Sequence, residues 1–187
     1  LFGIPMQFIA IDVETANHST HSICQIGLAE YCNGSINPVW QSLINPNEPF
    51  NPFNVAIHGI SESMVTGSPG FWEIYPSLQQ YLAVNIVVSH TKFDKHAINA
   101  AAERYSLPEI ACSWLDSTLI AKRAWPQFSR SGFGLANLCR FLEFDFKHHA
   151  ALEDAKACPY IVSQAIEKTG ICASEWLHRV KGPLRPL

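Results

Sequence analysis

The stretch from Phe8 to Thr15, which reads Phe-Ile-Ala-Ile-Asp-Val-Glu-Thr, constrains the fold more than any other part of the chain. Four apolar residues in succession predict a buried strand, and Asp12 and Glu14 follow them. Side chains two positions apart in a strand point to the same side, so both carboxylates project together from the end of this strand. Buried like charges repel each other, and no Lys or Arg is adjacent in sequence. A divalent metal ion would satisfy both carboxylates; the alternative is a strand end that reaches solvent.

Length and composition indicate one compact domain. The chain has 187 residues, a length that is enough for a substantial core. Of its residues 48% are hydrophobic and 16% charged, a composition typical of a folded domain. We expect this domain to span residues 6–169, with residues 1–5 as a remnant or tag and residues 170–187 as a tail. The net charge of −3 is unusual for a protein that coats long duplex DNA. If this protein binds nucleic acid, we therefore expect it to bind a short segment at the end of a strand.

The cysteines point to a reducing compartment. There are six of them, scattered along the chain without a Cys-x-x-Cys pair, and several lie in apolar periodic segments. We therefore expect a cytoplasmic protein with free thiols and without a zinc site. No apolar run approaches the length of a membrane span.

Hydrophobic periodicity and turn residues predict the remaining elements. Strands are expected over residues 23–31, 39–44, 84–88 and 110–115, with a tight hairpin at Asn33-Gly34. Helices are expected over residues 62–65, 71–82, 94–105, 116–124, 134–144 and 152–168, with a loop over 45–54 and a kink at Pro159. Three early strands followed by strands alternating with helices predict an α/β domain of three layers with a mixed central sheet of about five strands.

Two further acidic points accompany the first. Asp94 follows an apolar strand at the start of a helix, where an acidic residue is also favoured by the helix dipole alone. His149 lies at a loop-to-helix junction, and Asp154 follows five residues later, about 1.4 helical turns on. The alternative is a loop histidine with a solvated aspartate; His148 and Glu153 are the competing neighbours.

Together these residues resemble the DnaQ-like 3′–5′ exonucleases of the DEDDh type, which include proofreading subunits, RNase T and oligoribonuclease. The resemblance rests on Ile-Asp12-Val-Glu14-Thr, on Phe-Asp94 and on His149-x-x-x-x-Asp154-Ala, and it covers roughly residues 6–168. Residues 23–28 and 58–62 also look like family segments. It implies an RNase H-like fold. One departure is Ser89-His90-Thr-Lys-Phe before Asp94, where the family often shows His-Asn-x-x-Phe.

The resemblance also implies a mechanism with two divalent metal ions, Mg²⁺ or Mn²⁺. Asp12 would bridge both ions, and Glu14 and Asp154 would help to hold the ion that carries the attacking water. Asp94 would hold the second ion, directly or through water. His149 would be the general base, because an imidazole can accept a proton at neutral pH.

Substrate contacts are expected near the same segments. The resemblance implies them at Thr15, His58, Gly59, Ile60, His90 and Phe93. Ile60 would wedge between the last bases or, equally well, anchor its loop as a buried residue. Three aromatic residues could stack on bases, although aromatic residues are more often part of the core: Phe93, Phe133 and Trp125. Five basic residues could contact phosphates, although such residues are more often simply solvated: Lys92, Lys95, Arg130, Lys147 and His148. Asp116 is interpreted as a helix cap.

These observations predict a metal-dependent 3′–5′ exonuclease that releases nucleoside monophosphates from single-stranded DNA or RNA ends. One alternative is a nucleic-acid-end binding module that does not turn over. Another is a subunit that docks on a polymerase, and a homodimer is also open. The sequence does not choose between DNA and RNA.

Overall fold

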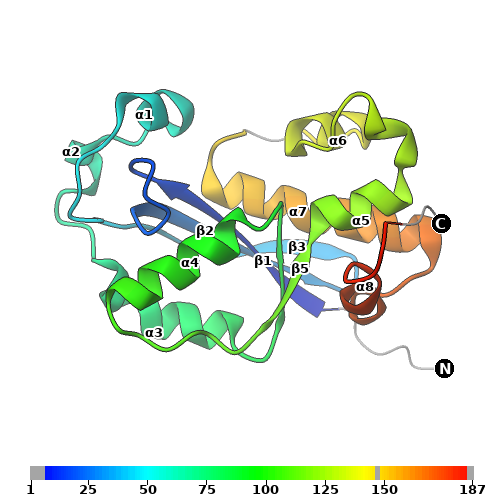
Figure 1. Cartoon of the computed structure of the whole chain (residues 1–187), viewed down its shortest axis with the longest axis horizontal. Helices are drawn as coiled ribbons and strands as arrows, with labels where there is room; N and C mark the ends of the chain where they lie inside the picture. Colours follow the sequence, from blue (N-terminus) through cyan, green and yellow to red (C-terminus); the bar gives the residue numbers. More distant parts are fainter. Residues whose placement is uncertain (1–6, 146–147, 185–187) are drawn as a thin grey trace.

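A mixed sheet of five strands forms the centre of the molecule in the computed structural model, which describes residues 7–145 and 148–184. The strands are β1 (Gln7–Thr15), β2 (Ile23–Cys32), β3 (Ser35–Leu43), β4 (Ile86–Ser89) and β5 (Ser113–Asp116). Their order is β3-β2-β1-β4-β5; β2 runs antiparallel to β1 and β3, whereas β4 runs parallel to β1 and β5 parallel to β4 (Figure 1). The predicted mixed α/β sheet of five strands is confirmed.

Helices lie in the connections from β3 to β4 and from β4 to β5, and after β5 (Figure 1). They are α1 (Pro52–His58), α2 (Glu62–Val65), α3 (Phe71–Leu82), α4 (Phe93–Arg104), α5 (Ser117–Ala124), the 3₁₀ helix η1 (Pro126–Ser129), α6 (Leu135–Phe141), α7 (Ala151–Thr169) and α8 (Ala173–Arg179). Within the residues that the structure describes, no helix has the length and apolar character needed to cross a membrane.

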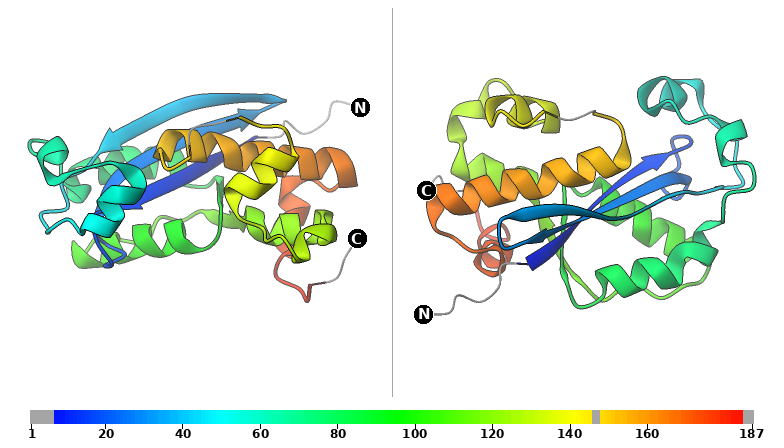
Figure 2. Two further views of the ribbon diagram at one scale, coloured as in Figure 1. Left: turned by 90° about the horizontal axis from the view of Figure 1, so that it is seen from above. Right: turned by 180° about the vertical axis from the view of Figure 1, so that it is seen from behind.

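Strand β1 separates two hydrophobic cores because its side chains alternate between the faces of the sheet. Phe8 and Ala10 pack with α5, α6, α7 and α8, whereas Ile9, Ile11 and Val13 pack with α3 and α4. Both views in Figure 2 show helices on the two sides of the twisted sheet. By the same alternation, Asp12 and Glu14 belong to the face that α7 covers.

The edge strands differ in extent from the expectation. The turn at Asn33 and Gly34 has positive φ angles of 48° and 93°, so β3 begins directly after it at Ser35 rather than at residue 39. Pro38 is tolerated within β3 because β3 is an edge strand. Strand β5 begins at Ser113, later than the predicted residue 110, since Ile110 packs into the core from the preceding loop.

The segment after Gly170 is not a tail over its described length, which corrects the expected division at residue 169. Helix α8 buries Trp176 completely, and Ile171 and Ala173 join it in the same core as Phe8. The tail interpretation is wrong because a helix of seven residues with a single buried large side chain gives almost no periodic signal.

Helix α1 occupies part of the predicted loop over 45–54 and the residues after it. Asn51 caps it by accepting a hydrogen bond from the Phe53 N–H (2.8 Å), and Pro52 stands at its first position. None of its residues is buried, so the hydrophobic pattern that identifies helices was missing. Helix α7, in contrast to α1, was predicted from its apolar positions, and it continues through Pro159 to Thr169.

Candidate active site

Three carboxylates meet where the end of β1 faces the start of α7. The carboxylate oxygens of Asp12, Glu14 and Asp154 come within 4.8 Å of one another. Asp154 is 3% exposed and lies in the first turn of α7. The spacing of Asp12 and Glu14 along β1 therefore places them as predicted, and α7 supplies the third group.

The first turn of α7 can approach the sheet this closely because β2 carries a glycine there. Gly27 pairs with Asp12 in the β1–β2 ladder. A Cβ atom at Gly27 would lie 2.3 Å from the backbone nitrogen of Leu152, a distance that no side chain can occupy. The neighbouring Gln25 accepts a hydrogen bond from the Ala151 N–H through Oε1 (3.2 Å) and so fixes the beginning of the helix.

Asp94 joins the site from the first turn of α4. It is 2% exposed, and its Oδ1 atom accepts a hydrogen bond from the Val13 N–H at 3.0 Å. Val13 lies between the two acidic residues of β1, so this bond ties α4 to the strand that carries Asp12 and Glu14. All four predicted acidic residues are thereby brought to one region of the molecule.

The four carboxylates repel one another in a poorly solvated setting. Burial, followed by the charges of Asp94, Asp154 and Glu14, raises the pKa of Asp12 well above its ordinary value. Burial and the charges of Asp154 and Asp94 raise the pKa of Glu14 to about 7. Burial likewise raises the pKa of Asp94 to about 7, against the hydrogen bond from Val13. Burial also raises the pKa of Asp154, although its hydrogen bond with His148 opposes this.

This donor set suits a hard divalent cation. Among the residues described, no Lys or Arg lies within ion-pairing distance of the four carboxylates, and His148 provides their one ion pair. Oxygen ligands are the ones that Mg²⁺ and Mn²⁺ prefer. The residues present therefore fit the binding of a divalent metal.

Two adjacent histidines face Asp154 in different ways. The Nδ1 atom of His148 lies 2.8 Å from Asp154 Oδ1, whereas the backbone N–H of His149 donates to Asp154 Oδ2 at 2.9 Å. The two rings are stacked, with centroids 3.8 Å apart. His149 adopts a positive φ of 65°, and the ligand atoms of His148, His149 and Asp154 lie within 4.8 Å of one another. Burial and the neighbouring His148 lower the pKa of His149.

Two side chains of the segment from α1 to Ile60 bind the same carbonyl group at the end of β1. Thr15 O accepts hydrogen bonds from Asn54 Nδ2 (3.0 Å) and His58 Nε2 (3.1 Å), while His58 Nδ1 accepts from the Ile60 N–H (3.0 Å). These bonds assign the ring proton of His58 to Nε2. Gly59 ends α1 with a φ of 76°, a conformation that glycine adopts without strain.

Ile60 is 4% exposed and packs against Ala16, Cys24 and Val65, so in this structure it anchors the loop. This position agrees with the alternative of a buried anchor, and contact with a base would require the loop to open. Thr15 is also buried, at 7% exposure. Roles of these residues toward substrate stay predictions.

The remaining predicted contacts differ in how exposed they are and in the partners they have within the protein. Phe93 is 42% exposed and available to a ligand, whereas Trp125 is 3% exposed and belongs to the core, as does part of Phe133. His90 uses both ring nitrogens within the protein, at 2.9 Å from Ser117 Oγ and 2.9 Å from Phe133 O. Arg130 is exposed, and Lys147 lies outside the described residues. Asp116 is the predicted cap: its Oδ1 accepts from the N–H groups of Thr118 and Leu119.

Several supporting residues were not found from the sequence. Gln25 and Gly27 lie in the family-like segment 23–28 but have no individual role assigned from the sequence, and Asn54 carries no spacing signal. The ring of His148, the neighbour that competes with His149 in the sequence, is the one that hydrogen-bonds to Asp154.

Comparison with known proteins now identifies the family. The exonuclease family model, RNase T, matches residues 9–162, which include all five predicted catalytic residues. The chain belongs to this exonuclease family. The predicted resemblance to DnaQ-like 3′–5′ exonucleases is thereby confirmed, and the family uses divalent metals.

Curated relatives are DNA polymerases. DNA polymerase III PolC-type from Streptococcus agalactiae is 29% identical over 153 residues, which is 80% of this chain and 10% of the polymerase. The corresponding protein of Caldanaerobacter subterraneus is 28% identical over 166 residues, 87% of this chain and 12% of the polymerase. The chain thus spans about a tenth of the length of these relatives.

Solved exonuclease structures share the fold. Exonuclease X, in complex with 5′ overhanging duplex DNA, gives a TM-score of 0.73 at 25% identity and covers 93% of this chain and 99% of its own. Exonuclease I gives a TM-score of 0.72 at 14% identity, with 92% of this chain and 42% of its own covered. The exonuclease domain therefore has the predicted RNase H-like fold.

Proposed function

We propose that this exonuclease domain removes nucleoside monophosphates from the 3′ ends of single-stranded DNA or RNA by metal-dependent phosphodiester hydrolysis. The observation that carries the proposal is the convergence of Asp12, Glu14, Asp94 and Asp154 without a Lys or Arg counter-charge among the described residues. A purely structural cluster would be expected to carry its own cations, because unpaired buried charges are costly.

Asp12, Glu14, Asp94 and Asp154 would hold two divalent ions, and we favour Mg²⁺ or Mn²⁺ over softer metals because every ligand is oxygen. When bound, these ions would neutralise charge on the phosphate and lower the pKa of a water molecule. Asp12 would be the central ligand of this set, because the charges of the other three carboxylates all act on it and raise its pKa.

His149 would take the proton of the attacking water. Its lowered pKa keeps the imidazole neutral, and therefore able to accept a proton, at pH 7. The bond from its backbone N–H to Asp154 holds the residue beside the carboxylates, while its exposed ring stacks on that of His148. Phe93, exposed next to Asp94, is available to stack on a terminal base.

The direction and product can be tested with strands labelled at the 5′ end. Matched DNA and RNA oligomers, incubated with Mg²⁺ or Mn²⁺, should give ladders that shorten from the 3′ end and release mononucleotides. A 3′-phosphate should slow the reaction. Rapid cutting of a circular single strand would contradict the proposal, and binding without release would favour the non-catalytic alternative.

The polymerase relatives support a second, narrower proposal, in which this domain edits the ends made by a DNA polymerase. Such a domain should remove a mismatched 3′ nucleotide from a primer faster than a matched one, and should co-purify with a polymerase. Six unpaired cysteines favour a reducing, cytoplasmic setting for this work.

A further inference from the structure

Positive charge is distributed very unevenly along this chain. Residues 1–91 contain six acidic residues and no Lys or Arg, whereas residues 92–187 contain all 13 Lys and Arg residues and ten acidic ones. Strands β1 to β4, α1 and α3 therefore bring no fixed cation to a bound polyanion. Any lysine or arginine contact to the phosphates of a substrate must come from the second half of the chain.

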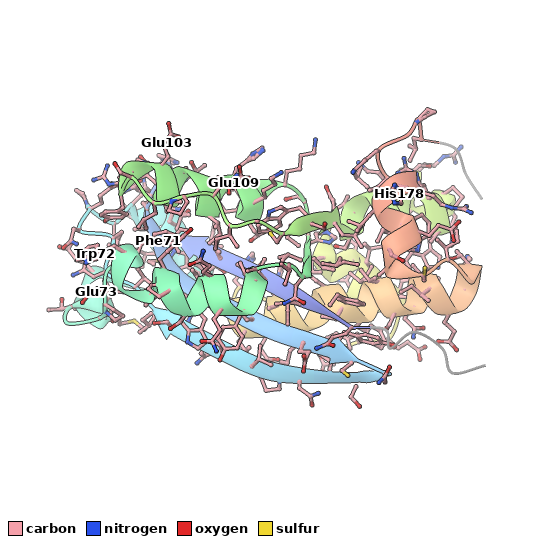
Figure 3. All side chains as sticks on the ribbon, turned by 90° about the horizontal axis from the view of Figure 1, so that it is seen from below. Phe71, Trp72, Glu73, Glu103, Glu109 and His178 are labelled. Atoms are coloured by element: carbon pink, nitrogen blue, oxygen red, sulfur yellow. The ribbon has the colours of Figure 1, made fainter. Side chains whose placement is uncertain are left out.

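Three of these lysines line one cavity, whose lining includes none of the four carboxylates. The cavity measures about 490 Å³ and lies where α4, β5, α5 and the segment after α8 meet. Lys92 and Lys95 come from the start of α4, and Lys181 comes from the end of the chain. Figure 3 shows α4, which carries Glu103, and α8, which carries His178, in one view, with the chain that leads through β5 into α5 between them.

The cavity is cationic and has an aromatic side chain in its lining. Among the described residues, no carboxylate lies within ion-pairing distance of Lys92, Lys95 or Lys181. Asp116 is the acidic residue that lines the cavity, and its Oδ1 is occupied by two N–H groups of α5. Trp114 is partly exposed within the same lining. Lysines beside an indole ring match a nucleotide, because phosphate needs cations and a base stacks on an aromatic ring.

Sheet topology places this cavity level with the active site. Strands β1, β4 and β5 are parallel, so their carboxyl ends share one edge of the sheet. In the sheet, Ala10 of β1 pairs with Val88 of β4, and the next residue of β4, Ser89, pairs with Asp116 of β5. Asp12 therefore lies about one residue further toward the carboxyl ends of the strands than Asp116. Two strand spacings separate β1 from β5, about 10 Å, which is about three nucleotides of a stacked strand.

We propose that the cavity lined by Lys92, Lys95, Lys181 and Trp114 binds a phosphate and base of the nucleic-acid substrate upstream of the nucleotide being removed. This inference rests on the proposed function for the position of the strand, and it adds a second anchoring point. Long strands would reach both sites, whereas a dinucleotide would reach the active site alone.

The test is the double variant Lys95→Gln/Lys181→Gln, which removes two charges from two segments and leaves side-chain length nearly unchanged. Its matched control is Lys122→Gln/Lys168→Gln, which removes two lysines of the same half of the chain that do not line the cavity. Binding of a long single strand protected by 3′ phosphorothioate linkages is measured at several salt concentrations. Hydrolysis of a long strand and of a dinucleotide is measured in parallel.

The cavity variant should bind the long strand about tenfold more weakly, and its logarithmic salt slope should fall by about 1.4, the value for two lost contacts to a single strand. Its hydrolysis of the dinucleotide should equal that of the wild type, and the control variant should show neither change. Equal losses on both substrates, or no loss on the long strand, would overturn the inference.

The two proposals fail in different ways. If the wild type hydrolyses neither oligomers nor the p-nitrophenyl ester of thymidine 5′-monophosphate, the proposed activity is wrong. Loss of strand binding in the cavity variant would then still support the second site, because that binding is measured without turnover. Normal hydrolysis by the cavity variant with unchanged strand binding would remove the second site alone.

Discussion

Asp154 accepts from two neighbouring residues at once, one through a ring and one through the backbone. His148 pairs with Oδ1 and the His149 N–H donates to Oδ2, so each oxygen accepts one hydrogen bond and keeps a lone pair for a metal ion. The bond from His148 uses its ring, whereas the bond from His149 comes from the backbone and leaves its imidazole available. This difference gives the two histidines separate expected roles.

His149→Ala should reduce the rate of oligomer hydrolysis about 10²–10⁴-fold, the usual range for loss of a general base. His148→Ala should keep most of the activity. Because the pKa of His149 lies below its ordinary value, the wild-type rate should rise with pH and reach its plateau at a lower pH than an ordinary imidazole would give. Rates of both variants and the wild type across this pH range provide the measurement. The same pH profile in His149→Ala as in the wild type would identify another group as the base.

Glu14 should make the metal-free protein less stable as the pH rises. Its folded-state pKa of about 7 exceeds the ordinary value of 4.5, so the folded state holds a proton that the unfolded state has released between these two pH values. Stability from this group is fully present below pH 4.5 and is lost as the pH rises through 7. Glu14→Gln removes that loss.

Melting temperatures in EDTA at mildly acidic and mildly basic pH provide the test. The wild type should lose more on going to basic pH than Glu14→Gln does, by about 2–4 °C for each ~1 kcal/mol of repulsion. Histidines contribute to both proteins alike and cancel in the comparison. An equal fall in melting temperature for both proteins would show that ionisation of Glu14 does not destabilise the folded state.

The main elements of this fold were predictable where periodicity is strong and burial is one-sided. Helix α3 has the predicted ends, Phe71 and Leu82, because Ile74, Leu78 and Leu82 repeat at helical spacing. Helices α1 and α8 were not predicted, since α1 buries nothing and α8 buries one large side chain. The carboxylate pair on β1 followed from strand geometry, but the addition of Asp94 and Asp154 depended on family resemblance.

At the scale of elements, the contact between β2 and α7 sets the position of Asp154. Gly27→Ala would push α7 from the sheet, because the added Cβ meets backbone atoms that cannot rotate away. The expected cost is about 1–3 kcal/mol of stability, together with severe loss of hydrolysis. Gly134→Ala is the control, since open space surrounds that position. Chemical unfolding and oligomer hydrolysis check both variants, and a fully active Gly27→Ala would show that α7 need not lie so close.

Helix α8 should behave as part of the domain. Trp176→Ala removes a completely buried ring and should cost about 3–5 kcal/mol. Trp176→Phe should cost less, because the buried indole Nε1 has no hydrogen-bond partner within the described part of the chain and its loss leaves nothing unpaired there. Trp72→Ala, at a ring that is 45% exposed, is the matched control. Equal stability of Trp176→Ala and Trp72→Ala would show that the segment after Gly170 is dispensable.

For the molecule as a whole, the carboxylate cluster is a place where stability is given up for function. The two cores and five strands hold four acidic groups together against their repulsion. Metal that binds only to the folded state should therefore stabilise the entire domain, increasingly with metal concentration. The second half of the chain adds the lysines through which a polyanionic strand can be held beside this acidic centre.

The most direct measurement is the melting temperature of the wild type and of Asp12→Asn, each in EDTA and across a titration with Mg²⁺ or Mn²⁺. Asp12→Asn keeps the shape of the side chain and removes the charge on which the other three carboxylates act. It should melt at or above the wild-type temperature in EDTA, gain less from metal and degrade almost no oligomer. A variant that is less stable than the wild type in EDTA, gains equally from metal and remains active would contradict a metal-dependent site built around Asp12.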